Sequence, residues 1–419
     1  MYSYDPLFYI PSEKMPFSVR LEYMMKSPVD EACLRTAVEE TMKRFPYFCI
    51  EVKEENGSLV TVPNPRPVVV YEGEHAPVFG SEELNRHWIA FSYYGKRICL
   101  HVTHVITDGG GLAPLQKTLL YHYLTRREGR EFNADGVRFP DTPFFSDECA
   151  PPYDREALRG VESLSKPNSA PVFHLPDGGV IRDNCPTVYR FRVAERDVMR
   201  YSHGHDASPC ALVAALMAKA VWAVHPQVTE DLVCDVSYNM RGALGCPHNY
   251  RLLSSALSLR YPKRLQEASV ERVCTCSRGM ISLQSQPENV RAYLDRKCQF
   301  IEAANALSTV EEKRRFVAPQ AVADATRNTF SVSYVGKSDY GDMEPYLVAI
   351  YNLTDGATDG AVMIEITAWD GWFNFAFLQG FSTDVYVRAF LRELDKEGLV
   401  YKVGEHGPLR VGGYELPGQ

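Results

Sequence analysis

The chain lacks an apolar stretch long enough to cross a bilayer, and it lacks an excess of positive charge. Its longest apolar run, residues 211–224, contains Lys219 and falls short of the roughly 20 residues that a membrane helix needs, so we interpret it as a buried helix. The formal net charge is −8, from 45 basic and 53 acidic side chains. Because this charge disfavours nucleic acid and anionic membranes, we expect neither as a partner.

The sequence also lacks a cysteine framework. Its 11 cysteines follow no regular spacing, which is typical of reduced thiols that fill a core. Cys274 with Cys276, and Cys246 with His248, could supply metal ligands, but a zinc site usually shows two matching pairs. We therefore expect no metal. The first residues lack a basic region followed by an apolar core, so we expect no secretory leader and a cytoplasmic location.

Several common catalytic motifs are missing as well. The sequence holds no G-x-S-x-G, H-E-x-x-H or G-x-G-x-x-G pattern, so nothing indicates a hydrolase elbow, a zinc protease or a dinucleotide site. Gly336 to Ser338 resembles the end of a phosphate-binding loop, but Ser331 stands where that loop requires glycine. Residues 355–360 resemble part of a calcium loop without its remaining carboxylates, and we interpret them as a turn.

Strand and helix patterns mix along the whole chain, which indicates a mixed α/β (α+β) fold. Residues 17–25 alternate in polarity, as a half-buried strand does, and Asp30 can cap the helix that follows. Residues 98–106 alternate again and lead into Asp108, three glycines and a second helical pattern. This segment therefore predicts a strand, a glycine turn and a helix.

A proline-rich stretch divides the chain. Residues 130–185 lose their periodicity and contain seven prolines, which predicts a linker between a first half, residues 1–175, and a second half, residues 176–419. In the second half we predict strands at 188–193, 232–237, 254–261, 329–335, 346–352, 361–368 and 372–379, and helices at 208–225, within 269–307 (two) and at 383–394. Asp370-Gly371 predicts a hairpin between the last two strands.

The pattern that points to chemistry begins at His101 and ends at Gly110. Alternation places His104 on the apolar face of its strand, where an imidazole is shielded from water and stays neutral, and a neutral imidazole can act as a general base. Asp108 can fix the turn by pairing with a cation, and the glycines allow a close ligand. A core histidine with a satisfied hydrogen bond explains the same pattern, so the spacing alone leaves the function open.

The sequence His104-Val-Ile-Thr-Asp108-Gly109 resembles the H-x-x-x-D-G motif of the coenzyme A-dependent acyltransferase superfamily. That superfamily includes chloramphenicol acetyltransferase, plant acyltransferases, alcohol acetyltransferases and the condensation domains of peptide synthetases. Thr103 replaces the first histidine of its longer form. The resemblance extends over most of the chain, through residues 17–46, the helix at 208–225, Asn239-Met-Arg241 with Asn249, and residues 331–336, where Tyr334 stands in place of a frequent asparagine.

The resemblance implies two chloramphenicol-acetyltransferase-like sandwich halves that face each other across a tunnel. It also implies that His104 is the general base and that Ser333, or else Ser331, donates a hydrogen bond to the oxyanion. An ordinary strand hydroxyl is the alternative for either serine. Asp108 would be structural, and we propose Arg241 as its ion-pair partner, against the alternative of a solvated arginine. Gly109, Asn239 and Thr103 complete the predicted site.

The predicted function is transfer of an acyl group from acyl-CoA to the hydroxyl or amine of a small acceptor, with coenzyme A as co-substrate and a monomer as the expected state. Three alternatives stay open. The donor could be an acyl carrier protein, as for a condensation-type module. The chain could be a non-catalytic binding protein that keeps the fold, or an unrelated α/β protein in which the motif arose by chance. The sequence leaves the acceptor and the acyl chain length undetermined.

Overall fold

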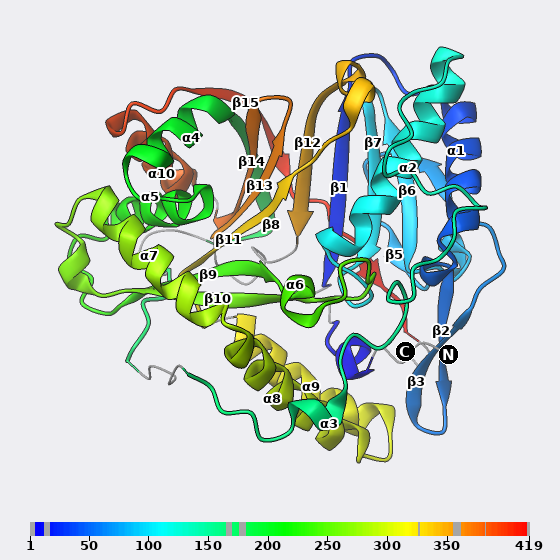
Figure 1. The fold of residues 1–419 in the computed structure, drawn as a ribbon, viewed down its shortest axis with the longest axis horizontal. Coiled ribbons are helices and arrows are strands. Elements are labelled where there is room, and N and C mark those ends of the chain that lie inside the picture. The colour runs from blue at the N-terminus through cyan, green and yellow to red at the C-terminus, as the bar shows by residue number, and fades with distance from the viewer. Residues whose placement is uncertain are drawn as a thin grey trace.

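The computed structural model describes residues 5–11, 17–164, 170–175, 182–325, 327–354, 362–381 and 383–416. Figure 1 shows two lobes side by side, each built on one large β-sheet with helices packed against it. The mixed α/β fold with two facing halves, predicted from the sequence, is confirmed. Residues 355–360, which resembled a calcium loop, lie outside the described ranges.

The first lobe contains a five-stranded sheet in the order β12-β1-β7-β6-β4. Its strands are β1 (Ser18–Met25), β4 (Val70–Glu72), β6 (Ile89–Tyr94), β7 (Arg97–Thr103) and β12 (Leu347–Thr354). Helices α1 (Glu31–Arg44) and α2 (Gly109–Glu128) pack on each other and share one apolar core with β1, β6 and β7. Asp30 caps α1 as predicted, because its carboxylate accepts the Cys33 N–H at 2.8 Å.

The second lobe contains a seven-stranded sheet in the order β10-β9-β11-β13-β14-β8-β15. Its strands are β8 (Arg182–Ala194), β9 (Leu232–Asn239), β10 (Ser254–Tyr261), β11 (Phe330–Lys337), β13 (Val362–Trp369), β14 (Trp372–Phe381) and β15 (Tyr401–Pro408). Helices α5 (Pro209–Val224), α7 (Val270–Gln284) and α10 (Val385–Lys396) share the core of this sheet. The predicted hairpin joins β13 to β14, with positive φ at Asp370 and Gly371 (46° and 74°).

Further helices and short strands complete the described fold. They are α3 (Arg155–Leu158), α4 (Glu195–Gly204), α6 (Arg241–Leu244), α8 (Pro287–Asn305), α9 (Val310–Ala325), the hairpin β2 (Ile50–Glu55) with β3 (Ser58–Pro63), the pair β5 (Val78–Phe79) with β16 (Gly413–Tyr414), and five short 3₁₀ turns, the last at Gly341–Tyr346. The two helices predicted within residues 269–307 are α7 and α8. Helix α9 was not predicted, since Pro319 lies inside it and interrupts the pattern.

Strand β12 belongs to the second part of the sequence but to the sheet of the first lobe. It pairs antiparallel with β1, with Leu21 opposite Asn352 and Tyr23 opposite Ile350. It also contacts β13 of the second sheet, and Figure 1 shows it between the two sheets. The boundary between residues 175 and 176 stays a prediction. One strand from the second half of the sequence, β12, belongs to the sheet of the first lobe.

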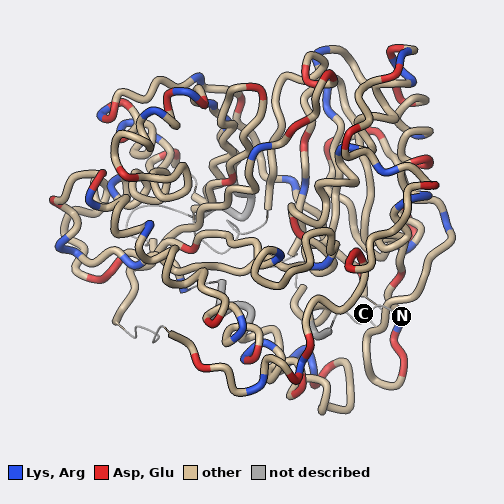
Figure 2. Tube along the Cα trace, in the orientation of Figure 1, with Lys and Arg blue, Asp and Glu red and all other residues tan. Residues whose placement is uncertain are grey.

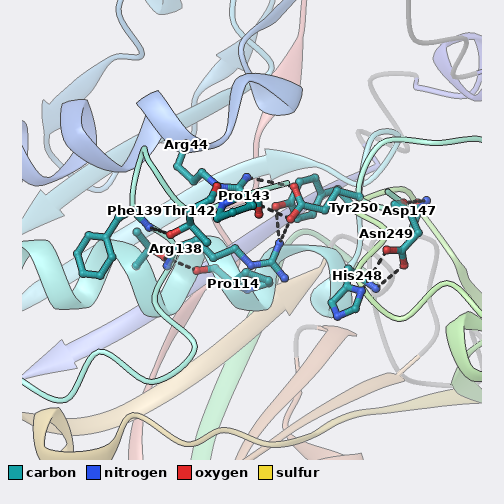
Figure 3. Close-up of polar contacts among 12 residues, drawn as sticks. Arg44, Pro114, Arg138, Phe139, Thr142, Pro143, Asp147, His248, Asn249 and Tyr250 are labelled. Carbon is teal, nitrogen blue, oxygen red and sulfur yellow. Dashed lines mark hydrogen bonds and ion pairs between the residues drawn. The ribbon is translucent and has the colours of Figure 1, made fainter. Parts of the chain in front are cut away.

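Part of the predicted linker is packed between the lobes. Glu148 is 1% exposed and pairs with Arg44 at 2.9 Å and with Arg138 at 2.7 Å, while Arg138 also donates to the Tyr250 hydroxyl at 2.6 Å. Figure 3 shows this cluster joining elements of both lobes. This part of the predicted linker is therefore packed against both lobes, while the division of the chain at the linker stays a prediction. Prolines remove the helix and strand periodicity, but buried ion pairs still order the segment.

Three further features bear on the sequence predictions. Among the described helices, none alone has the length and apolarity to cross a membrane, and α4 with α5 meets that criterion only as a pair bent by 84°. Within the same ranges, no three histidine, cysteine or acidic side chains gather where they could hold a metal ion. Lys and Arg are interspersed with Asp and Glu over both lobes in Figure 2.

Candidate active site

A cavity of about 290 Å³ lies between the two sheets. The first lobe lines it with side chains of β1 and β12 and with His104, which follows β7. The second lobe lines it with the ends of β9 and β10 and with β11 and β13, including Ser333 and Glu365. Both lobes therefore contribute to one site, and the histidine of the motif lines it.

His104 lies in a turn, not on the strand face where alternation placed it. Strand β7 ends at Thr103, whose hydroxyl donates to the Phe17 carbonyl and accepts the Val105 N–H, both at 3.3 Å. The His104 backbone N–H donates to the same carbonyl at 2.7 Å, and the imidazole stacks on the Phe17 ring. Thr103 thus ends the strand, and His104 is half-buried at the cavity wall.

One nitrogen of the His104 ring is already engaged. Nδ1 lies 2.7 Å from the carbonyl oxygen of Thr107. Because a carbonyl only accepts, Nδ1 carries the proton in the neutral ring, and Nε2 is left as the basic nitrogen. This arrangement fixes the tautomer that a general base requires.

Asp108 forms the ion pair with Arg241 that the sequence predicted. The two side chains are 4% and 5% exposed, and their closest oxygen and nitrogen atoms are 2.8 Å apart. The carboxylate also caps α2 by accepting the Gly111 N–H at 2.9 Å, and it accepts the Leu253 N–H at 2.8 Å. Asp108 is therefore fully occupied by contacts that tie the start of α2 to the second lobe.

The guanidinium of Arg241 makes further hydrogen bonds besides its ion pair with Asp108. Its guanidinium donates to the backbone carbonyls of Asn249 and Arg251 at 2.8 and 2.7 Å and to the Asn239 side-chain oxygen at 3.2 Å. A solvated arginine, the alternative interpretation, is excluded by this burial. Asn249 in turn donates to the carbonyls of Asp147 and Ala150, as part of the contact between lobes in Figure 3.

The sequence predicts a separate turn at the glycines after Asp108. In the structure these glycines instead form the first turn of α2. Because they lack a side chain, these glycines let residues of the second lobe approach the start of α2 closely. A Cβ on Gly110 would lie 2.7 Å from the Arg241 guanidinium, and one on Gly111 would lie 2.3 Å from the Tyr250 carbonyl oxygen. Only glycine leaves room for the second lobe to pack this near the helix start.

Replacing Gly111 with alanine should destabilise the protein by roughly 1–3 kcal/mol or more, because the backbone of Tyr250 must shift to admit the Cβ. Urea titration followed by tryptophan fluorescence measures this change. Gly279→Ala, at an exposed helical position of α7 with no atom within 4 Å of the added Cβ, is the matched control and should stabilise by roughly 0.5–1 kcal/mol. Equal effects of both substitutions would refute the close-packing role.

The structure separates the two candidate serines. Ser333, on β11, is 6% exposed and lines the cavity. Ser331 accepts a hydrogen bond from Asn328 at 2.9 Å and is not among the lining residues. Thr103 also lies outside the lining, whereas Gly109 and Asn239 belong to it. The roles proposed for His104, Asp108, Gly109 and Ser333 in catalysis stay predictions.

Glu365 is a cavity residue that the sequence motifs do not predict. It lies opposite Ser333 on the neighbouring strand β13 and is 2% exposed. Burial raises the pKa of its carboxyl to about 7, although hydrogen bonds from Ser333 and Thr354 act in the opposite direction. The available signal was one acidic residue within the apolar run Val362-Met-Ile-Glu365-Ile366, a position where strands of a core seldom carry charge.

No family model matches the chain, and no curated protein matches its sequence. Solved structures do match it. TRI101 of F. graminearum, complexed with coenzyme A and T-2 mycotoxin, aligns over 95% of this chain and 98% of its own, with a TM-score of 0.59 and 12% identity. Polyketide synthase associated protein 5 from Mycobacterium tuberculosis covers 90% of this chain and 93% of its own, with a TM-score of 0.57 and 13% identity.

A condensation domain gives a similar match. The first condensation domain of the calcium-dependent antibiotic synthetase, in complex with a substrate analogue, covers 91% of this chain and 90% of its own, with a TM-score of 0.57 and 15% identity. Identities this low establish the fold and nothing finer. The chain therefore shares the two-lobed fold of these solved structures, the fold that the family resemblance of its His104 motif implied.

Proposed function

We propose that the protein transfers an acyl group from acyl-CoA to the hydroxyl or amine of a small acceptor, with His104 as the general base. The observation that carries this proposal is the position of His104 in the cavity between the sheets, with Nδ1 bonded to the Thr107 carbonyl and Nε2 as the basic nitrogen. The match to TRI101, which was solved with coenzyme A, supports the choice of donor.

In the proposed reaction, Nε2 of His104 takes the proton of the acceptor as the acceptor attacks the thioester carbonyl. The tetrahedral oxyanion then collapses, the carbon–sulfur bond breaks, and the imidazolium returns the proton to the leaving thiolate. General base action of this kind typically contributes about 10²–10⁴-fold to the rate. Asp108 and Arg241 keep the start of α2 and the second lobe in place around this histidine.

We assign the oxyanion donor to Ser333, which lines the same cavity from the second lobe. Its hydroxyl has one proton, and this proton is directed either to the neighbouring Glu365 carboxyl or to the oxyanion. Ser333 therefore rotates away from Glu365 in order to stabilise the intermediate. Ser331 is the weaker candidate because Asn328 already contacts it outside the cavity lining.

The test follows release of free coenzyme A from acyl-CoAs of increasing chain length, with and without pooled small alcohols and amines. The proposal predicts acceptor-dependent thiol release and an ester or amide product detected by mass spectrometry. Heat-denatured protein is the control. Turnover of an acyl group loaded on a carrier protein, with none from any acyl-CoA, would favour the condensation-type alternative that the matched condensation domain suggests. Absence of both reactions would refute the proposed function.

A further inference from the structure

The cavity contains one buried carboxyl without a positive partner. Seven acidic side chains are buried in the described part of the chain: Glu22, Asp108, Glu148, Asp235, Asp295, Glu365 and Glu393. Five of these pair with a lysine or arginine, among them Asp108 with Arg241 and Glu393 with Lys396. Asp235 accepts hydrogen bonds from Ser258 and Asn328 and does not line the cavity. Among the described residues, Glu365 is therefore the one buried carboxyl of the cavity lining that has no cationic partner.

The contacts of Glu365 favour its ionised form. Both side chains that bond it are hydroxyls, and the Thr354 hydroxyl donates to Oε1 at 3.1 Å. Hydroxyl donors stabilise a carboxylate, but two neutral donors replace only part of the hydration that burial removes. Within the described residues, no lysine or arginine forms an ion pair with this carboxylate. A cation that entered the cavity would meet its charge directly.

We propose that Glu365 binds a protonated amine of the acceptor, so that the substrate is a small compound with an ammonium group and with its hydroxyl or second amine turned toward His104. This inference rests on the proposed function, because it assigns the acceptor of the same site. Leu21 and Met363 give the cavity apolar walls, and Phe17 and Tyr334 add aromatic rings. Such walls accommodate an alkyl or aryl chain between the two polar ends of the acceptor.

Among the described residues, Arg241 is the only arginine that lines the cavity, and it does not compensate Glu365. Arg241 is bound to Asp108 through two nitrogen–oxygen contacts, and its remaining donors go to backbone carbonyls and to Asn239. His104 is the other basic side chain of the lining, and its Nδ1 proton is bonded to Thr107. An anionic acceptor would thus face an unpaired carboxylate, whereas an ammonium would neutralise it.

The test compares two probes of matched size, 5-aminopentan-1-ol and hexan-1-ol, by isothermal titration calorimetry at about pH 8, where Glu365 is ionised. Wild-type protein should bind the amino alcohol about tenfold or more tightly than the neutral alcohol, the effect of one charge-assisted hydrogen bond. Glu365→Gln keeps an acceptor for Thr354 but removes the charge, and it should abolish the preference. Thr354→Val keeps the carboxyl but removes one hydroxyl that stabilises its ionised form, so it should only reduce the preference.

Glu393→Gln is the matched control, since Glu393 is also buried but lies in α10 and pairs with Lys396. This variant should keep the wild-type preference. Equal affinity of wild-type protein for the two probes, or an unchanged preference in Glu365→Gln, would overturn the inference, and so would the absence of measurable binding of 5-aminopentan-1-ol. Binding is measured without turnover, so a protein that prefers the amine but releases no coenzyme A would refute the proposed function and leave the amine site standing.

Discussion

Replacing Asp108 with alanine should lower the free energy of unfolding by about 3–5 kcal/mol, because the substitution leaves the Arg241 charge buried without its partner. The carboxylate is 4% exposed and accepts hydrogen bonds from the Gly111 and Leu253 backbone N–H groups as well as from Arg241. These groups come from both lobes. Urea titration followed by tryptophan fluorescence measures the loss, and circular dichroism reports whether the variant folds.

Asp30→Ala is the matched control for this effect. Asp30 caps α1 through the Cys33 N–H at 2.8 Å, as Asp108 caps α2, but Asp30 is exposed and forms no ion pair in the described structure. Loss of the cap alone should cost about 1 kcal/mol. The double variant Asp108→Ala with Arg241→Met should recover part of the stability lost in Asp108→Ala. A loss of only about 1 kcal/mol for Asp108→Ala would contradict the structural role of the pair.

The second large effect concerns Glu365 and depends on pH. Its pKa is about 7 in the folded protein, against an ordinary value of 4.5, because burial disfavours the charge. Because the pKa is raised, protonation of Glu365 stabilises the folded protein. This stabilisation is fully present below pH 4.5 and is lost as the pH rises through about 7. Glu365→Gln should therefore be more stable than wild type by roughly 3 kcal/mol at alkaline pH and of equal stability near pH 4.5.

Thermal or urea unfolding of wild type and Glu365→Gln at both pH values checks this expectation. Glu393→Gln should show no gain at alkaline pH, since it removes a carboxylate that is paired with Lys396. Identical stability of wild type and Glu365→Gln at alkaline pH would show that the Glu365 charge is compensated in the folded protein. The reason to expect a gain, an unpaired buried carboxylate, is also the basis of the proposed amine site.

Local sequence patterns predicted most of the regular elements. The strand at residues 254–261 matches β10 at both ends, Asp30 caps α1, and Ser208 caps α5. These features depend on side-chain alternation and capping residues close in sequence, so a local pattern suffices. The same holds for the hairpin at Asp370-Gly371, where both residues take positive φ values.

The remaining features depend on contacts between residues far apart in sequence. Alternation predicts a strand that continues beyond Thr103, whereas β7 ends there. The local sequence does not show that the Thr103 hydroxyl donates to the Phe17 carbonyl. The local pattern predicts a turn at the glycines of α2, because the close approach of Tyr250 is a tertiary contact that the local sequence does not show. The pair of Asp108 and Arg241 was predicted only through the family resemblance, and Glu365 lay outside that resemblance altogether.

The central claim is that His104 acts as the base in a cavity shared by both lobes, and single-turnover release of coenzyme A from wild type and His104→Asn tests it most directly. Asparagine can still donate to the Thr107 carbonyl but offers no basic nitrogen, and His203→Ala, at an exposed histidine of α4, controls for nonspecific effects. We predict that His104→Asn lowers the acceptor-dependent rate by about 10²–10⁴-fold, while His203→Ala retains the wild-type rate. Equal rates of release by wild type and a folded His104→Asn protein would contradict the account.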